Sequence, residues 1–146
     1  MLGRQDPYRN FRFRIEIDGI TQAGFHECHF GDTTSEVIEY REGGDPPAVR
    51  KESGPVHFGN IVLKRGITDS MELYTWRKQV EDTGAQGARK NMSIILIDEA
   101  GNDRARWDFK NAWPARYGLW NDFDAKGHGV LYEVIEVAHE GFRRVR

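Results

Sequence analysis

The chain has 146 residues, of which 38% are hydrophobic and 30% are charged, and its formal net charge is −2 at pH 7. This length fits a single domain with a core large enough to need no structural metal, and one cysteine, Cys28, excludes a framework of intrachain disulfides. The near-neutral charge argues against a dedicated nucleic-acid binder, and no apolar run is long enough for a membrane helix.

The first predicted element is a strand over residues 11–17, where apolar and charged side chains alternate as in a strand buried on one face. Asp18-Gly19 follows, and this dipeptide favours a two-residue type I′ turn. We therefore predict a hairpin whose return strand covers residues 20–30. Gly24 lies where the alternation of the return strand changes phase, so we predict a β-bulge there.

Residues 35–41 again have the pattern of a strand, but sequence rich in glycine and proline follows. The stretch 42–47 is a dense turn signal, and Gly54-Pro55 interrupts the polar segment after it. Strand character resumes over residues 57–65. We therefore expect residues 41–57 to form a long, mobile excursion between two paired strands, and a loop of that length in a compact domain usually has a function.

One helix is predicted between residues 68–70, which offer N-cap side chains, and Thr83-Gly84, which ends it. Asp69 and Glu72 have the spacing of a capping box. Residues 84–87 are expected to form a loop. The apolar stripe that would face the core consists of Leu73, Trp76 and Val80.

The C-terminal half returns to strands. Residues 91–97 are apolar on both faces and should be buried on both, and residues 98–102 form a turn. A strand follows over 104–113, and the last covers 130–139. The residues expected on one face of the 104–113 strand are Ala105, Trp107, Phe109 and Trp113. Seven or eight strands with one helix indicate a mainly β fold, an antiparallel β sandwich or barrel with one flanking α-helix, in a single domain over 1–146.

Cys28 and its neighbouring histidines are the residues that most resemble a chemical site. On a strand His26 and Cys28 share a face while His29 points away, so at most two of them could bind one metal ion. Structural zinc needs four ligands. The serines lie in no Gly-x-Ser-x-Gly motif, and no glycine-rich loop has the residues of a phosphate site. We therefore expect no catalytic activity, no cofactor and no metal.

The surface pattern indicates contacts with other chains. Basic residues alternate with aromatic ones and so lie on the opposite side of their strands, which argues against a stacking platform for nucleic acid. The charged strand faces and the long excursion have no evident use within one domain. An open sheet also has edges that must be covered, and a ring of identical neighbours would cover them.

Several segments, taken in order, resemble a known family. They are 6–13, 17–20 with 23–25, 36–44, 59–61 with 63–68, 111–114 and 140–141. Together they resemble the tail tube (inner tube) proteins of contractile-tailed phages and of phage-tail-like contractile injection systems, over nearly the whole chain. The resemblance implies a fold related to the haemolysin-coregulated protein of type VI secretion.

The resemblance also implies a structural role without catalysis. Family members form hexameric rings that stack into a tube inside a contractile sheath, around a channel for DNA or protein cargo. The implied partners are further copies of the chain, the sheath, the baseplate and spike hub, tube-terminating proteins and the cargo, with no direct lipid binding. Because the first residues lack the apolar core of a secretory signal, we expect assembly in the bacterial cytoplasm and release within the finished particle.

The resemblance implies that the excursion over residues 40–57 is the family's extended hairpin, which reaches the neighbouring ring. It also suggests two sets of site residues. The expected contacts between subunits or rings are Tyr40, Arg41, Glu42, Gly43, Gly44, Asp45, Lys51, His57, Arg65 and Gly66. The charged faces expected to line the channel or the tube exterior are those of Arg12, Arg14 and Glu16, and of Arg104, Arg106 and Asp108.

Two stretches depart from the family pattern. Residues 28–31 stand where related sequences carry a Ser-Gly-Leu-like stretch, and residues 51–56 lack the usual Leu-Pro-Gly-Leu-like character. These departures are consistent with a subtype that assembles beside a second tube paralogue. Two other readings stay open: a monomeric β-barrel that binds a small ligand in an enclosed apolar cavity, and an enzyme that uses Cys28 and a histidine.

Overall fold

The structure is a computed structural model that describes residues 11–20, 24–41, 43–44, 49–120 and 129–146. Within these ranges it has nine strands and two helices. The strands are β1 (Arg12–Ile17), β2 (Phe25–His29), β3 (Thr33–Tyr40), β4 (Arg50–Phe58), β5 (Ile61–Gly66), β6 (Lys90–Ile97), β7 (Asp103–Leu119), β8 (Tyr132–Ala138) and β9 (Phe142–Arg144), and the helices are α1 (Glu72–Thr83) and α2 (Ala85–Ala88). The predicted mainly β, antiparallel fold with a flanking helix is confirmed, and α2 replaces a predicted loop.

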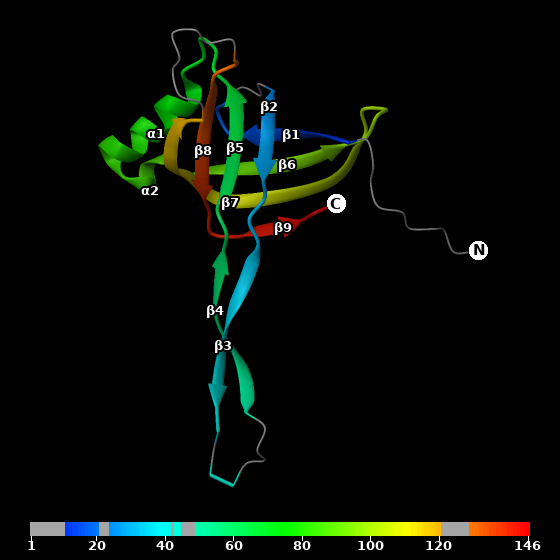
Figure 1. Ribbon diagram of the computed structural model, residues 1–146, viewed down its shortest axis with the longest axis vertical. Coiled ribbons are helices and arrows are strands. Elements are labelled where there is room, and N and C mark those ends of the chain that lie inside the picture. Colours follow the sequence, from blue (N-terminus) through cyan, green and yellow to red (C-terminus); the bar gives the residue numbers. More distant parts are fainter. Residues whose placement is uncertain (1–10, 21–23, 42, 45–48, 121–128) are drawn as a thin grey trace, which may run out of the picture.

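Two sheets face each other across the core, and their strands run across one another (Figure 1). Sheet A consists of β1, β6, the first half of β7 and β9, and sheet B of β2, β5, β8 and the second half of β7. β7 can serve both sheets because it turns at Asn111, which has a positive φ of 54°. The turn inserts an extra residue opposite β6, so Ala112 and Pro114 are buried after it. Trp113 therefore does not share the face of Phe109, contrary to the prediction.

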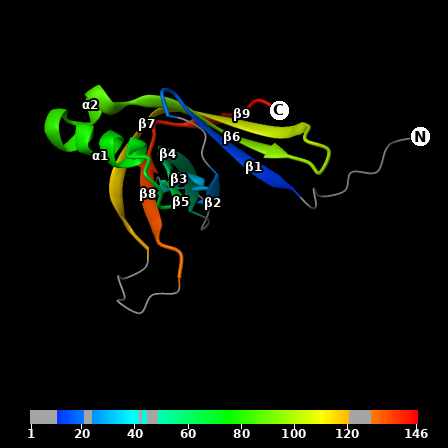
Figure 2. The same cartoon turned by 90° about the horizontal axis from the view of Figure 1, so that it is seen from above.

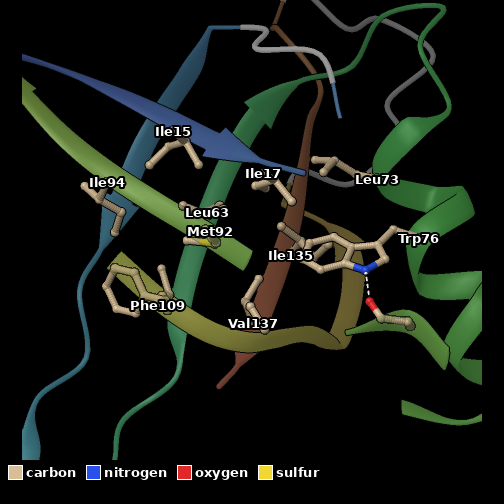
Figure 3. Packing of buried hydrophobic residues seen from close by; sticks show 13 residues of the cluster. Ile15, Ile17, Leu63, Leu73, Trp76, Met92, Ile94, Phe109, Ile135 and Val137 are labelled. Carbon is tan, nitrogen blue, oxygen red and sulfur yellow. Dashed lines mark hydrogen bonds between the residues drawn. The ribbon is translucent and has the colours of Figure 1, made fainter. Parts of the chain in front are cut away.

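The core lies between the two sheets and extends beneath α1 (Figure 3). Ile15 and Ile17 of β1 face Ile94 and Met92 of β6, as the alternating pattern predicts. The buried side chains contributed by the other elements are Ile61, Leu63, Leu73, Trp76, Ala88, Phe109, Ala112, Ile135 and Val137.

Helix α1 buries Leu73 and Trp76, and the Trp76 indole N–H donates to the Ala88 carbonyl at 2.6 Å. The predicted capping box is wrong: the N-cap is Met71, without a side-chain cap bond, because the helix begins later than expected. Gly84, with a φ of 82°, ends the helix as predicted. No helix among the described residues is long and apolar enough to cross a membrane.

The predicted hairpin over residues 11–30 is wrong in its pairing. The turn at Asp18-Gly19 forms, with the Ile20 N–H bonded to the Ile17 carbonyl at 3.0 Å, but the described residues of the two predicted strands share one isolated bridge, Ile17–Ile20. β1 pairs instead with β6, and β2 pairs with β5. The bulge lies between Phe25 and Glu27 rather than at Gly24.

β3 and β4 form a separate two-stranded sheet that projects from the body (Figure 1). Residues 50–58 form one strand of this hairpin, within the segment expected to be a long excursion. The predicted strand 57–65 is divided at Gly59-Asn60. An extra residue on β4 at Gly54-Pro55 opposes Glu36, and such a bulge accommodates a proline, which has no N–H for the ladder.

Candidate functional site

The charged residues of β1 and β7 lie together on the outward face of sheet A. Both strands pair with β6, so Arg14 and Arg106 lie on either side of Ile95. Arg14 Nε lies 3.2 Å from one carboxylate oxygen of Glu16, and Arg106 Nη2 lies 3.6 Å from the other. Glu16 therefore links two arginines that are far apart in the sequence.

Further ion pairs extend this network. They are Arg14–Asp103 (3.2 Å) and Arg106–Asp108 (2.9 Å) on the face, and Arg104–Asp98 (2.7 Å) beside the turn at 98–102. The register between β6 and β7 shifts after Leu96, so Asp103 rather than Arg104 lies opposite Ile97. Arg12, the remaining predicted residue of β1, is exposed. Each pair is partly exposed and adds little stability. Their combined effect is a face on which opposite charges alternate.

Two uncharged residues of β6, Ile95 and Ser93, lie beneath these pairs. The burial of Ile95 was predicted from the apolar residues on both faces of 91–97, whereas the role of Ser93 was not. Ile95 is fully buried although it lies on the side of the arginines, whose aliphatic parts can cover it. Ser93 Oγ donates to Asp108 Oδ1 at 2.7 Å and accepts from Arg106 Nη2 at 3.1 Å. The bond from Ser93 holds the pKa of Asp108 below its usual value.

The projecting hairpin carries most of the predicted contact residues. Those described are Tyr40, Lys51 and His57 on its strands and Arg41, Gly43 and Gly44 beyond the end of β3, whereas Glu42 and Asp45 lie outside the described residues. His57 Nε2 lies 2.9 Å from Glu36 Oε1 across the strands. The register places Val37 and Val56 on one face, where they are 62% and 54% exposed. The hairpin therefore presents apolar surface to solvent.

The root of this hairpin is a tight crossing of two chain segments. A Cβ on Gly31 would lie 2.3 Å from the Gly59 carbonyl oxygen, so only glycine fits there. The rings of Phe30 and Phe58 pack edge-on against Phe142, with centroids 5.0 and 5.9 Å apart. This packing fixes the direction in which the hairpin leaves the body.

His139 completes the root. Its Nε2 lies 3.0 Å from the Gly59 carbonyl oxygen, which can only accept, and its Nδ1 accepts from the Gly141 N–H at 3.1 Å. These partners require the neutral ring with its proton on Nε2. Burial lowers the pKa of His139, which favours the same neutral form. Sequence reasoning missed this residue; the only signal was the paired Phe-Gly steps at 30–31 and 58–59.

Arg65, a predicted subunit contact, is only 2% exposed. Its Nε and Nη2 donate to Glu133 Oε1 at 3.0 and 2.8 Å, and the Tyr117 hydroxyl donates to Glu133 Oε2 at 2.8 Å. Burial, with the bond to Glu133, raises the pKa of Tyr117 to about 12. The Arg65 side chain thus stabilises the inside of sheet B. Only the backbone at 65–66 is left for the predicted contact, which stays a prediction.

Cys28 is half-buried on β2, and burial raises the pKa of its thiol to about 12, which makes the thiol a poor nucleophile. The His29 side chain is exposed and its Nε2 lies 3.6 Å from Glu27 Oε2, whereas the His26 ring packs against Tyr132 with their centroids 5.0 Å apart. In the described part of the chain, no three His, Cys, Asp or Glu side chains are placed to hold a metal ion.

Comparisons with known proteins agree on one class. One similar solved structure is a subunit of the anti-feeding prophage baseplate, described as 6-fold symmetrised, with 22% identity over 99% of this chain and 97% of that one and a TM-score of 0.77. A second is a subunit of the sheath-tube complex of PVC, an extracellular contractile injection system, in the extended state, with 24% identity over 94% of this chain and 90% of that one and a TM-score of 0.80. A third is Hcp1 from Flavobacterium johnsoniae, with 18% identity over 91% of this chain and 94% of that one and a TM-score of 0.61. No curated protein matches. The model of the family described as T4-like virus tail tube protein gp19 matches residues 9–143. This chain therefore belongs to the T4-like virus tail tube protein gp19 family.

Proposed function

We propose that this chain is a structural subunit of the inner tube of a contractile injection machine, whose copies form hexameric rings that stack around a channel for cargo. The observation that carries the proposal is the family match over residues 9–143. The sixfold symmetry named for the similar baseplate structure supports the number of subunits. The cargo is DNA or a protein effector.

The sheet edges support assembly from identical copies. In the described part of the chain, β1 and β2 are the two ends of the strand order, and each pairs with one neighbouring strand. An unpaired edge is a template for another strand, and contacts between two different edges close into a ring when the rotation allows it.

The hairpin supports contact between rings. It extends away from both sheets, its root is held by packed rings, and Val37 and Val56 remain exposed. We propose that it reaches the adjacent ring, with the candidate residues over 40–57 at the contact. The charged face of sheet A, with its balanced ion pairs, would serve as a hydrated wall of the channel or of the tube exterior.

The proposed partners follow from the similar structures, which come from a baseplate and from a sheath-tube complex. They are the contractile sheath, the baseplate and tube-terminating proteins. The spike hub and a second tube paralogue are proposed from the family resemblance alone. The chain would be assembled in the cytoplasm as a component of a phage tail or of a phage-tail-like particle.

Negative-stain microscopy tests the proposal. The purified protein, alone and co-expressed with its baseplate and sheath partners, is expected to form rings or tubes with a central channel. A monodisperse monomer under all of these conditions would overturn the proposal and favour a monomeric ligand-binding barrel.

Shortening the hairpin separates ring formation from stacking. Replacing residues 36–55 with Asn-Gly keeps the pairs from Thr33–Phe58 to Ser35–Val56 and closes them with a favourable turn. We expect single rings without tubes, counted by microscopy beside the unmodified protein. Long tubes from the shortened variant would show that the hairpin is dispensable for stacking.

A further inference from the structure

On one flank of the molecule, no other described segment covers the apolar inner face of sheet A. The start of β1, the end of β6 and the start of β7 extend past β2, the last strand of sheet B (Figures 1 and 2). Beneath this overhang lies a groove of about 310 Å³. The residues that line it include Phe11, Phe13, Leu96 and Trp107 from the overhang and Cys28 and Phe30 from β2 and its end.

The groove is unusually apolar for a free surface. Phe11 and Phe30 are 53% and 41% exposed, and the side chains between them continue into the core. Among the described residues, β1 and β2 each have one neighbouring strand, and both elements contribute side chains to the groove. A contiguous apolar patch of this kind marks a binding surface.

The opposite flank is closed by α1 (Figure 2). There Arg77 Nη1 donates to the carbonyls of Pro114 and Ala115 at 2.9 and 3.1 Å and so caps the outer edge of β7. Tyr74 projects from the helix beside this edge, 42% exposed, with its ring centroid 5.8 Å from that of Tyr117. This flank therefore offers an exposed aromatic ring on a rigid helix.

The two flanks also differ in charge. The last turn of α1 contains no basic residue, so Glu81 and Asp82 lie at the negative end of the helix dipole. Lys78 on the preceding turn pairs with both carboxylates at 3.6 and 3.7 Å, and Arg77 Nε lies 3.9 Å from Glu81. At the groove, Arg144 lies over the Trp107 ring, 5.5 Å from its centroid. The exposed carboxylates at the helix end and the Arg144 guanidinium beside the groove carry opposite charges.

We propose that the groove of one copy receives the α1 flank of the next copy, with Tyr74 in the groove and the acidic end of α1 facing Arg144. The inference rests on the proposed function and names the surfaces that join subunits within a ring. Because the two surfaces are different and lie on opposite flanks, each copy uses both, and the contact propagates around a closed ring.

Two single variants and their mixture test this pairing. Phe11→Glu places a carboxylate in the groove, and Tyr74→Glu places one on the helix, so each alone should weaken ring formation by about tenfold or more in native mass spectrometry. Mixed, the two variants should form dimers, because the intact helix of one fits the intact groove of the other. Val37→Glu, at an exposed apolar position on the hairpin, is the control and should still form single rings.

The outcomes separate the inference from the proposed function. If the unmodified protein forms rings but either variant does so equally well, or the mixture stays monomeric, the assignment of these two surfaces is wrong and the proposed function stands. If the unmodified protein forms no rings even with its partners, the proposed function fails and the inference fails with it. Circular dichroism checks folding, and if Phe11→Glu is unfolded, Arg144→Glu at the exposed rim replaces it in the same mixture.

Discussion

At the scale of single residues, the pair Arg65–Glu133 shows how a charged residue can belong to the core. Both side chains are nearly inaccessible, at 2% and 4% exposure, and Tyr117 donates to the same carboxylate. Arg65→Met would leave the Glu133 carboxylate buried without its cation. We expect a loss of about 3–5 kcal/mol in the free energy of unfolding, measured by urea denaturation.

The double variant Arg65→Met/Glu133→Gln is the matched control. It removes both charges but keeps an acceptor for the Tyr117 hydroxyl, so it should recover more than half of the lost stability. A double variant as unstable as Arg65→Met would mean that packing, rather than the uncompensated charge, accounts for the loss.

At the scale of elements, the hairpin depends on its root. Gly31→Ala would place a methyl group against the Gly59 carbonyl, and we expect a loss of about 1–3 kcal/mol of stability together with loss of stacking into tubes. Gly43→Ala, where nothing lies within 4 Å of the added carbon, is the control and should change stability by no more than about 0.5 kcal/mol. Equal effects of the two substitutions on thermal unfolding would contradict the close contact between Gly31 and the Gly59 carbonyl.

The same root should respond to pH through His139. Above an ordinary imidazole pKa of about 6.5 the ring is neutral in both the folded and the unfolded chain. Because burial lowers the pKa of His139 in the folded state, the unfolded chain takes up the proton first as pH falls, and stability is lost over that window. The melting temperature should therefore fall more between about pH 7.5 and about pH 5.5 than it does for His139→Gln, which cannot be protonated. If the melting temperatures of the unmodified protein and of His139→Gln fall by the same amount, His139 is excluded as the cause of the pH dependence.

At the scale of the whole molecule, one strand holds the two sheets together. β7 changes sheets at Asn111, whose left-handed conformation suits asparagine and glycine, and Asn111 Nδ2 donates to Glu140 at 2.6 Å. Asn111→Ala should cost about 1–2 kcal/mol in chemical denaturation, and Asn111→Gly should cost less because glycine adopts this φ freely. Equal losses of stability would show that the hydrogen bond to Glu140, rather than the left-handed backbone at residue 111, accounts for the effect.

The sequence by itself determined the features that depend on neighbours in the chain. Alternation identified the buried faces of β1 and β6, Asp18-Gly19 marked a turn, and Gly84 marked the end of α1. Several segments that follow one another in the same order as in the tail tube family also indicated that family, because together they cover nearly the whole chain. These signals are local or cumulative, so they need no knowledge of which strands meet.

Only the tertiary structure decided which partner completes each element. Alternation shows which face of a strand is buried but not which strand supplies its hydrogen bonds, so β1 was assigned to β2 although it pairs with β6. Charge likewise suggests exposure, yet Arg65 is buried because Glu133 and Tyr117 surround it. The position of the groove beside β2 also depends on how far one sheet extends past the other, which is set by packing between residues distant in sequence.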